Sequence, residues 1–285
     1  MQLGGHLVKA IAWMGGALLS FTAMAISVRE LSSGMHAFEM LFIRSAMGVA
    51  ILVPIVWATG WRTLRTKRIA GHLLRNAVHF TGQVLWIFGI ALLPLATVFA
   101  IEFTTPIWGA ILAVAFLGER MNRGRWVALL FGFIGILVIL RPGMAAVGSG
   151  ALIMLACSLF FGATSVITKW LTRSDQPFAI VFYMALTQTL FGAVASVFVW
   201  TPVAVDAWPL LVLLAITGLT AHYSLTRALS VADASFVMPF EFLRLPLIGG
   251  TGFLLYGEAI EPATFFGAVL IFAGTYYSLR HESRR

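Results

Sequence analysis

Six ionisable side chains lie inside long apolar stretches of this chain, and any chemistry it performs is expected to involve them. In chain order they are Arg44, His79, Glu102, His222, Glu241 and Arg244. If the stretches cross a membrane, each such group costs about 2.5–3.5 kcal/mol to insert and must face a helix-bundle interior or a water-filled cavity. Groups kept at that cost typically bind a polar ligand or carry a proton. These six are therefore our candidate binding or coupling residues.

A stripe of polar residues in the third apolar stretch adds to this set. Its members are His72, Asn76, His79, Gln83 and Trp86. Steps of four, three, four and three place them on one face of a helix. Lipid does not tolerate so polar a face, so it either packs against other helices or lines a cavity, with His79 and Gln83 deepest. Arg75, about one and a half turns inside the end of the stretch, is expected to extend to the membrane surface instead.

Glu241 and Arg244 raise a separate question, because they lie three residues apart in a highly apolar segment. At that spacing they can neutralise each other on a helix, or they can be the two ends of a ligand site. Glu102 has no basic residue within a helical turn. It needs either an interhelical partner, for which Arg44 is the candidate, or a proton. A carboxylate kept protonated in a poorly hydrated site would couple proton movement to transport.

Aromatic residues and missing motifs bound the chemistry further. The rings that could stack on a flat or cationic ligand are those of Trp86, Trp108, Tyr223 and Phe240. The single cysteine, Cys157, excludes an internal disulfide and a cysteine-rich metal site. The sequence has no phosphate-binding P-loop, no HExxH zinc motif and no GxSxG nucleophile elbow. We therefore expect no enzyme activity, no cofactor and no metal; His79 with Glu102 is the pair that an intramembrane enzyme would use.

The elements that position these residues are predicted to be membrane-spanning helices. The chain has 285 residues, of which 60% are hydrophobic and 11% charged, and its mean hydropathy is +0.95. Soluble domains carry roughly 25% charged residues, whereas a helix crosses the hydrocarbon with about 20 apolar residues. Stretches of that length predict an all-α polytopic membrane protein whose ten spans are 8–28, 37–58, 70–92, 95–117, 124–140, 149–169, 178–200, 209–228, 234–256 and 262–280.

The basic residues at and beyond the ends of the spans predict the orientation. With the N-terminus in the cytoplasm, only Arg29 and Arg141 fall on the outer side. The inner side receives Lys9, Arg62, Arg65, Lys67, Arg68, Arg120, Arg123, Arg125, Lys169, Arg173, Arg227, Arg280, Arg284 and Arg285. Because cytoplasmic loops carry the excess of Lys and Arg, both termini are predicted to be cytoplasmic. The net charge of +8 then reflects a bilayer rather than nucleic acid as partner.

An internal repeat divides the chain into two halves. The segment "EFTTPIWGAILAVAFLGER" at 102–120 aligns with "EFLRLPLIGGTGFLLYGEA" at 241–259, and the second copy has one extra residue beside Arg244. Five spans in each half give domains 1–143 and 144–285, and an odd number inverts the second half relative to the first. Inverted repeats of this kind are typical of secondary transporters that work by alternating access.

Prolines lie in or beside both aligned segments. They are Pro106, Pro239 and Pro246. Each proline removes a backbone hydrogen bond from its helix and leaves a carbonyl group that a cavity could use.

The longer repeat units "ALLPLATVFAIEFTTPIWGAILAVAFLGER" and "ALSVADASFVMPFEFLRLPLIGGTGFLLYGE" resemble the drug/metabolite transporter superfamily, EamA type. The resemblance covers essentially the whole chain. "MHAFEMLFIRS" (35–45) and "HLLRNAVHF" (72–80) are most similar to the branch that contains bacterial S-adenosylmethionine and riboflavin carriers. The resemblance implies alternating access around a central cavity without an ATP site.

We therefore expect a secondary active transporter in the cytoplasmic (inner) membrane of a bacterium. Its substrate would be a small polar organic metabolite, either amino-acid-like, nucleoside-like or a vitamin, with proton coupling as one mode of transport. The alternative is a multidrug exporter of the same fold, which would have an acidic cavity without compensating cations. Arg44 and Arg244 fit an anionic or zwitterionic ligand better. Import, export and exchange remain open at this stage.

Overall fold

The computed structural model describes residues 5–32, 34–93, 95–140, 148–257 and 262–282, and within them the chain is helical without strands. Ten helical segments are seen in these ranges: α1 (Gly5–Leu31), α2 (Ala37–Thr59), α3 (Ile69–Leu92), α4 (Leu95–Glu102) with α5 (Thr105–Leu117), α6 (Arg123–Leu140), α7 (Ser149–Leu171), α8 (Pro177–Ser196), α9 (Trp208–Val231), α10 (Ala234–Val237) with η3 (Met238–Leu243) and α11 (Arg244–Tyr256), and α12 (Pro262–Glu282). Short 3-10 turns precede α3 (η1, Trp61–Leu64) and α9 (η2, Val205–Ala207). The prediction of an all-α protein is confirmed.

Six of these helical stretches in the described part of the chain are long and apolar enough to cross a membrane. They begin at Gly5, Ala37, Ser149, Pro177, Val205 and Pro262. The α5 helix is equally apolar but shorter, because the fourth segment is broken in two. The segment ends agree with the predicted spans to within a few residues.

The chain forms two compact units, and each unit takes helices from both halves of the sequence. Unit 1 comprises residues 1–11, 81–167 and 231–285, and unit 2 comprises 12–80 and 168–230. Helix α3 contributes its first half to unit 2 and its second half to unit 1. The predicted boundary between residues 143 and 144 lies outside the described residues.

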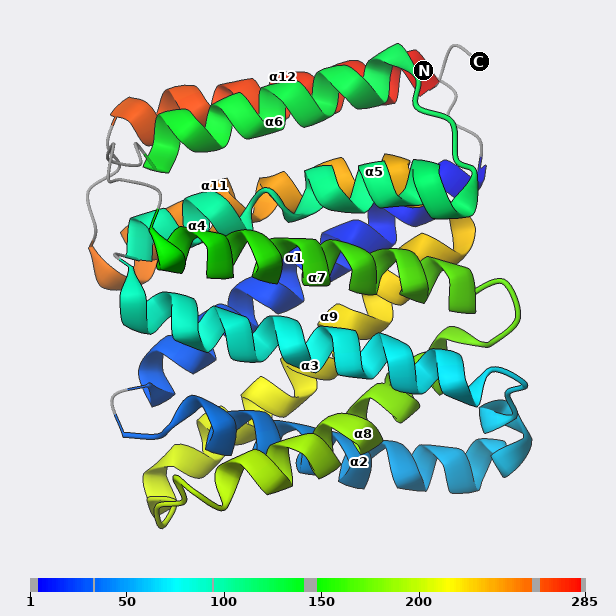
Figure 1. The fold of residues 1–285 in the computed structure, drawn as a ribbon, viewed down its shortest axis with the longest axis vertical. Coiled ribbons are helices and arrows are strands. Elements are labelled where there is room, and N and C mark those ends of the chain that lie inside the picture. The colour runs from blue at the N-terminus through cyan, green and yellow to red at the C-terminus, as the bar shows by residue number, and fades with distance from the viewer. Residues whose placement is uncertain (1–4, 33, 94, 141–147, 258–261, 283–285) are drawn as a thin grey trace. The chain divides into compact units, whose positions relative to one another are not determined.

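In unit 1, α6 and α12 pack along each other (Figure 1). Glycines permit this packing: a Cβ added to Gly135 would lie 2.7 Å from the carbonyl oxygen of Gly267. Gly274 faces the Phe131 side chain in the same way, with 2.6 Å to an added Cβ. Small residues of this kind let helix backbones approach closely inside a membrane.

Unit 1 also contains the two interrupted helical segments, and they are interrupted at corresponding places. The α4 helix ends at Glu102 and α5 resumes at Thr105, while η3 replaces regular α-helix around Glu241. Both segments end on a glycine in the left-handed region, Gly118 at φ 69° and Gly257 at φ 64°. The sequence repeat at 102–120 and 241–259 is thus also a repeat of backbone shape.

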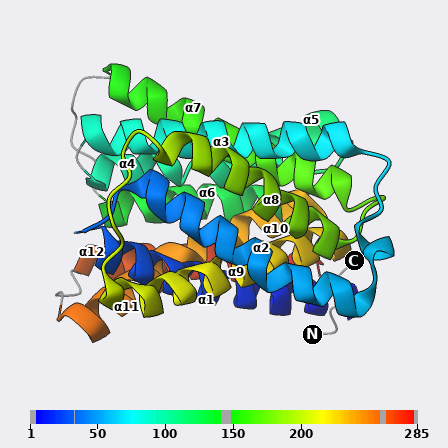
Figure 2. The ribbon, with the colours of Figure 1, turned by 90° about the horizontal axis from the view of Figure 1, so that it is seen from below.

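In unit 2, α2 and α8 lie side by side, which both ribbon views show (Figures 1 and 2). Their contact buries Leu52 and Val56 of α2 against Val181 and Ala185 of α8. Pro54 lies inside α2 without ending the helix. Unit 2 therefore holds its polar residues on continuous helices, whereas unit 1 holds its own beside helix breaks.

Candidate functional site

The polar centre of unit 1 joins the two interrupted segments through an ion pair. Arg244 Nη2 donates to Glu102 Oε1 at 3.0 Å, and Trp86 Nε1 donates to Glu102 Oε2 at 2.7 Å. The Arg244 guanidinium also lies 5.1 Å from the centre of the Phe103 ring. Both oxygens of Glu102 are therefore held, one by a cation from the second half of the chain and one by the polar stripe of α3.

This arrangement corrects the prediction that Arg44 is the partner of Glu102. Arg244 takes that role, so the ion pair of Arg244 is with the repeat mate of Glu241 rather than with Glu241 itself. In the described part of the chain the Glu241 carboxylate forms no hydrogen bond or ion pair, yet it lies within electrostatic range of both Arg244 and Glu102. Two carboxylates thus share one guanidinium.

Four buried side-chain polar atoms of unit 1 have no hydrogen-bond partner in the described part of the structure. One, His281 Nδ1, lies near the end of α12, and the other three are Gln83 Oε1, Thr105 Oγ1 and Trp108 Nε1. An unsatisfied buried group costs about 1–3 kcal/mol, and such groups mark places where water or a ligand completes the bonding. Thr105 and Trp108 follow directly on the break after α4, so these atoms extend the site along α5.

The polar centre of unit 2 contains Arg75, which was expected at the membrane surface. That expectation is wrong, because the side chain is only 3% exposed. Its Nε donates to Thr168 Oγ1 at 3.1 Å and its Nη1 to Asn76 Oδ1 at 2.9 Å. Both partners lie in the interior, so the guanidinium turns inward rather than toward an interface.

Two histidines and a second arginine occupy the same part of unit 2. The rings of His79 and His222 meet edge to face with centroids 5.4 Å apart, and Phe21 packs on His222 at the same distance. Arg44 Nη1 lies 3.5 Å from Met24 Sδ. Both Arg44 and Arg75 are within electrostatic range of the two histidine rings.

Three residues of the stripe on α3, His72, Asn76 and His79, are buried in the protein, and Gln83 and Trp86 are half-buried. Asn76 Nδ2 donates to the Tyr183 carbonyl at 3.2 Å, and Gln188 Nε2 donates to the Asn76 carbonyl at 3.4 Å. The sequence left open whether the stripe packs against other helices or lines a cavity, and its residues differ in this respect. His72 and Asn76 serve packing, whereas Gln83 keeps a free acceptor.

His72, in the first turn of α3, belongs to a structural contact with the loop after α7. Its Nε2 lies 2.6 Å from Asp175 Oδ2, and Thr66 Oγ1 donates to the same oxygen at 2.5 Å. Burial raises the pKa of Asp175, but hydrogen bonds from Thr66, His72 and Ser174 outweigh it and hold that pKa below its usual value. This contact, between the segment before α3 and the loop after α7, is a clasp rather than a binding site.

Two of the aromatic candidates are packing residues. Phe240 is 4% exposed and lies against Phe236 with ring centroids 5.4 Å apart. Tyr223 meets Trp13 edge to face at 5.8 Å. Sequence position alone could not separate them from Trp86, whose indole nitrogen donates to Glu102, or from Trp108, whose indole nitrogen is buried without a hydrogen-bond partner among the described residues.

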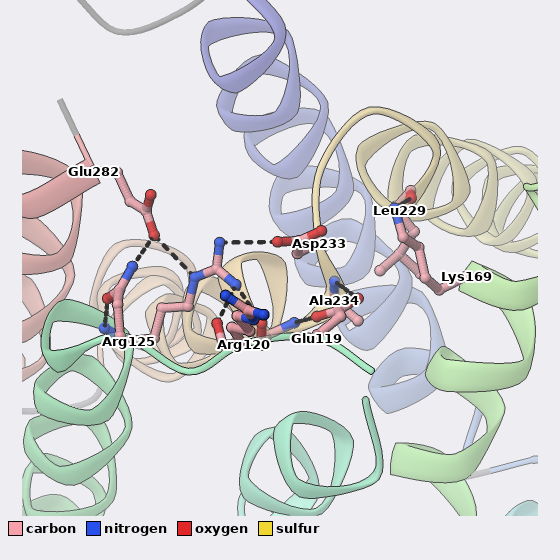
Figure 3. A network of polar contacts seen from close by, with 10 residues as sticks. Glu119, Arg120, Arg125, Lys169, Leu229, Asp233, Ala234 and Glu282 are labelled. Carbon is pink, nitrogen blue, oxygen red and sulfur yellow. Dashed lines mark hydrogen bonds and ion pairs between the residues drawn. The ribbon is translucent and has the colours of Figure 1, made fainter. Parts of the chain in front are cut away.

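At one end of unit 1, Arg125 is the centre of a buried polar network (Figure 3). It donates to Asp233 Oδ2 at 3.0 Å, to Glu282 Oε1 at 2.9 Å and to Ser235 Oγ at 2.6 Å. Beside it, Glu119 accepts the backbone N–H groups of Ala234 and Ser235 at 2.8 and 2.7 Å. The network ties the start of α6 to α10 and to the end of α12. Sequence reasoning assigned Arg125 only to a charged loop.

Metal chemistry has no candidate ligands here: the described residues contain no group of three or more His, Cys, Asp or Glu side chains able to hold an ion. Cys157 is buried, with its Sγ 3.2 Å from the Gly82 carbonyl, and serves packing.

The fold and the polar centres define a polytopic membrane transporter, and comparison with known proteins gives its family. The EamA-like transporter family model matches residues 8–141 and again residues 148–280. The chain therefore belongs to the EamA-like transporter family, as its motifs predicted, and is a transporter rather than an enzyme.

Relatives match along almost the whole chain. An S-adenosylmethionine uptake transporter of Rickettsia bellii is 27% identical, over 96% of this chain and 94% of the relative. A riboflavin transporter of Rhizobium johnstonii is 32% identical, over 98% of this chain and 93% of the relative. A solved crystal structure has the same fold, with a TM-score of 0.83 at 17% identity over 97% of this chain and 98% of that one.

Proposed function

We propose that this chain is a secondary active transporter that moves a small polar organic metabolite across the cytoplasmic membrane of a bacterium by alternating access. Relatives that carry S-adenosylmethionine and riboflavin support a nucleoside-like, amino-acid-like or vitamin substrate. The double family match supports two five-span repeats, at 1–143 and 144–285, as the moving halves.

Both termini are proposed to be cytoplasmic, on the strength of the positive charges in alternate loops. Cysteine labelling tests this orientation. Lys67 and Asp206 are both exposed and lie in loops proposed for opposite sides. A Cys at position 206 should react with an impermeant reagent in intact cells, and a Cys at position 67 only after permeabilisation. The reverse pattern would overturn the orientation.

One observation supports proton coupling: Glu102 and Glu241 share the single guanidinium of Arg244. With both carboxylates ionised the cluster carries one uncompensated negative charge in a poorly hydrated place, and a proton on Glu241 removes it. A substrate cation and the proton would then compete for the same negative charge, so that one can bind only when the other has left, which links the two movements.

The alternative of a multidrug exporter fits these charges less well. An exporter of lipophilic cations would need carboxylates without compensating cations. Here Glu102 is compensated by Arg244, and unit 2 has two interior guanidinium groups, Arg44 and Arg75, that make no ion pair within the described ranges.

The test uses the purified protein in proteoliposomes. Uptake of radiolabelled S-adenosylmethionine, riboflavin and a set of L-amino acids is measured with and without an imposed pH gradient, and by exchange against the same unlabelled compound. We expect the gradient to raise uptake of one compound several-fold. Glu241→Gln should keep exchange and lose the response to the gradient, because it cannot release a proton.

Asp206→Asn, at an exposed carboxylate, is the matched control and should behave like wild type. If no compound of the set crosses the membrane, the substrate class is wrong. If uptake of a carried compound does not change with the pH gradient, or if Glu241→Gln still responds to the gradient, the proposal of proton coupling is wrong. The proposal of transport would remain valid.

A further inference from the structure

The interior of unit 2 brings two guanidinium groups and two histidine rings together, whereas its buried carboxylates, Glu39 and Asp175, bond to other residues. Arg44 of α2, Arg75 and His79 of α3 and His222 of α9 come together there, and we call these four residues the cation cluster. Throughout the described ranges neither guanidinium of the cluster forms an ion pair. Their hydrogen-bond partners are neutral: Thr168 Oγ1, Asn76 Oδ1 and Met24 Sδ.

This lack of a counter-charge distinguishes Arg75 from Arg125, the other buried arginine among the described residues. Arg125 is as well buried as Arg75 but meets the carboxylates of Asp233 and Glu282. A guanidinium stays charged at any pH a protein meets, so Arg75 cannot relieve its burial by losing a proton. Removing a charge from water costs several kcal/mol unless a counter-charge is supplied.

The polar atoms beside the cluster point to a ligand that supplies this charge. A guanidinium presents a planar fork of donors that fits the two oxygens of a carboxylate or phosphate. Thr168 and Asn76 hold two of the Arg75 nitrogens, Nε and Nη1, and so fix the plane of its fork. Next to Asn76, Gln188 Oε1 is buried without a partner in the described structure and can accept an N–H from the same ligand.

We infer that the cation cluster binds an anionic group of the transported substrate, a carboxylate or a phosphate, with Arg75 as its main contact and Arg44 as the second. This inference rests on the proposed transport function and adds a substrate class to it. His79 and His222 lie against each other at the same place and contribute ring N–H donors. The substrate class is then one with an acidic end, such as a zwitterionic amino-acid-like compound.

The first test needs no knowledge of the substrate, because it uses the anion alone. The melting temperature of the purified protein is measured in sodium acetate, sodium phosphate and sodium chloride at equal ionic strength. A ligand that binds only the folded state raises the melting temperature. We expect acetate or phosphate to raise it by several degrees over chloride, and the responding salt tells carboxylate from phosphate.

Arg75→Gln should abolish this rise while melting in chloride at or above the wild-type temperature, because the variant removes an uncompensated charge. Arg44→Gln is the second variant, and should weaken the rise. Arg68→Gln is the control: Arg68 belongs to the same unit but stacks on Trp170 and donates to its carbonyl. It should keep the full rise. An equal melting temperature of the wild type in all three salts, or an unchanged rise in Arg75→Gln, overturns the inference.

The second test separates this inference from the proposed function. In proteoliposomes that exchange labelled S-adenosylmethionine, the decarboxylated analogue should compete at least ten-fold more weakly than the unlabelled parent, and Arg75→Gln should remove that difference. If the anions stabilise the protein through Arg75 but no compound of the set is carried, the anion site stands and the transport proposal fails. If compounds are carried and both analogues compete equally, the transport proposal stands and the anion site fails.

Discussion

Units 1 and 2 each hold guanidinium groups away from water, but they treat the charge differently. In unit 1, Arg244 is paired with Glu102 and Arg125 with Asp233 and Glu282. In unit 2, Arg75 meets only neutral oxygens. A paired interior charge stabilises the fold that pairs it, whereas an unpaired one is a cost that a ligand can remove. The contrast separates arginines whose charge the protein already compensates from one whose charge a ligand can compensate, without reference to any known substrate.

The backbone differs in the same way. The Glu102–Arg244 pair of unit 1 lies where helices are interrupted, at the end of α4 and the start of α11, so carbonyl groups freed by the breaks lie near it. The cluster of unit 2 lies on α2, α3 and α9, which continue through it. Continuous helices hold side chains in a fixed place, which suits a binding site. Interrupted helices change shape at lower cost, which suits a segment that moves during alternating access.

The largest expected effect is the loss of the ion pair in unit 1. Arg244→Gln leaves the Glu102 carboxylate with only the Trp86 N–H, and we expect the free energy of unfolding to fall by about 3 kcal/mol. The double variant Glu102→Gln with Arg244→Gln removes both charges and should recover most of that loss. Thermal melting of the wild type, both single variants and the double variant gives the coupling energy.

Arg75→Gln in unit 2 is the matched comparison, and it should not lower stability. If Arg244→Gln and Arg75→Gln destabilise the protein equally, the distinction between paired and unpaired arginines is wrong. If the double variant is no more stable than Arg244→Gln alone, the Glu102–Arg244 contact is not a stabilising pair.

Hydropathy predicted the ten helical segments well, because the length of a span is set by the thickness of the hydrocarbon. Repeated prolines also pointed to the interrupted segments: Pro106 falls in the first turn of α5 and Pro239 in the first turn of η3. These are local effects, so a single sequence contains them.

The pairing of charges was less predictable, because it depends on contacts between distant segments. Glu241 lies three residues from Arg244 and was the natural partner by spacing, yet Glu102, in the other half of the chain, takes the ion pair. Arg75 was misjudged for a related reason. Arg75 lies close enough to the end of α3 for its side chain to extend to the membrane surface. Only its hydrogen bond to Thr168 on α7 shows that the side chain points into the protein. One signal did exist: Arg75 lies next to Asn76 in the polar stripe.

The clasp in unit 2 tests what decides the effect of removing a buried charge on stability. It asks whether that effect depends on the pairing of the charge or on the unit in which the charge lies. Asp175 is paired with His72 and Thr66, and its pKa lies below the usual value. A lowered folded-state pKa means that the stabilisation is complete above the unfolded value of about 4 and is lost as the pH falls through the folded value. Asp175→Asn should therefore cost about 1.5 kcal/mol at pH 7.

The measurement is thermal melting of wild type and Asp175→Asn between pH 8 and pH 3. The difference should stay constant down to about pH 5 and shrink below about pH 4. Asp206→Asn, at an exposed site, should show no such difference at any pH. A difference that persists at pH 3 would mean that Asp175 acts through shape rather than charge.

The smallest effect concerns the two glycines that end the interrupted segments of unit 1. Gly118 and Gly257 have φ of 69° and 64°, and an added Cβ would meet no atom within 4 Å at either position. Alanine at each place should therefore cost only the backbone penalty of the left-handed region, about 1 kcal/mol.

Gly250 is the control, because it lies inside α11 with equally open space around it. Alanine there should stabilise by about 0.5–1 kcal/mol, since a helical glycine loses more backbone entropy on folding. Melting of the three single variants, with opposite signs for the caps and the helix interior, would establish that the two segments share one backbone design. The sharper test is that alanine should cost the same free energy of unfolding at Gly118 and at Gly257. Equal costs would show that both halves of the chain end their interrupted helices in the same conformation, although only the second half has a charge at Arg244. A cost at one glycine without the other would limit the resemblance between the halves to their sequence.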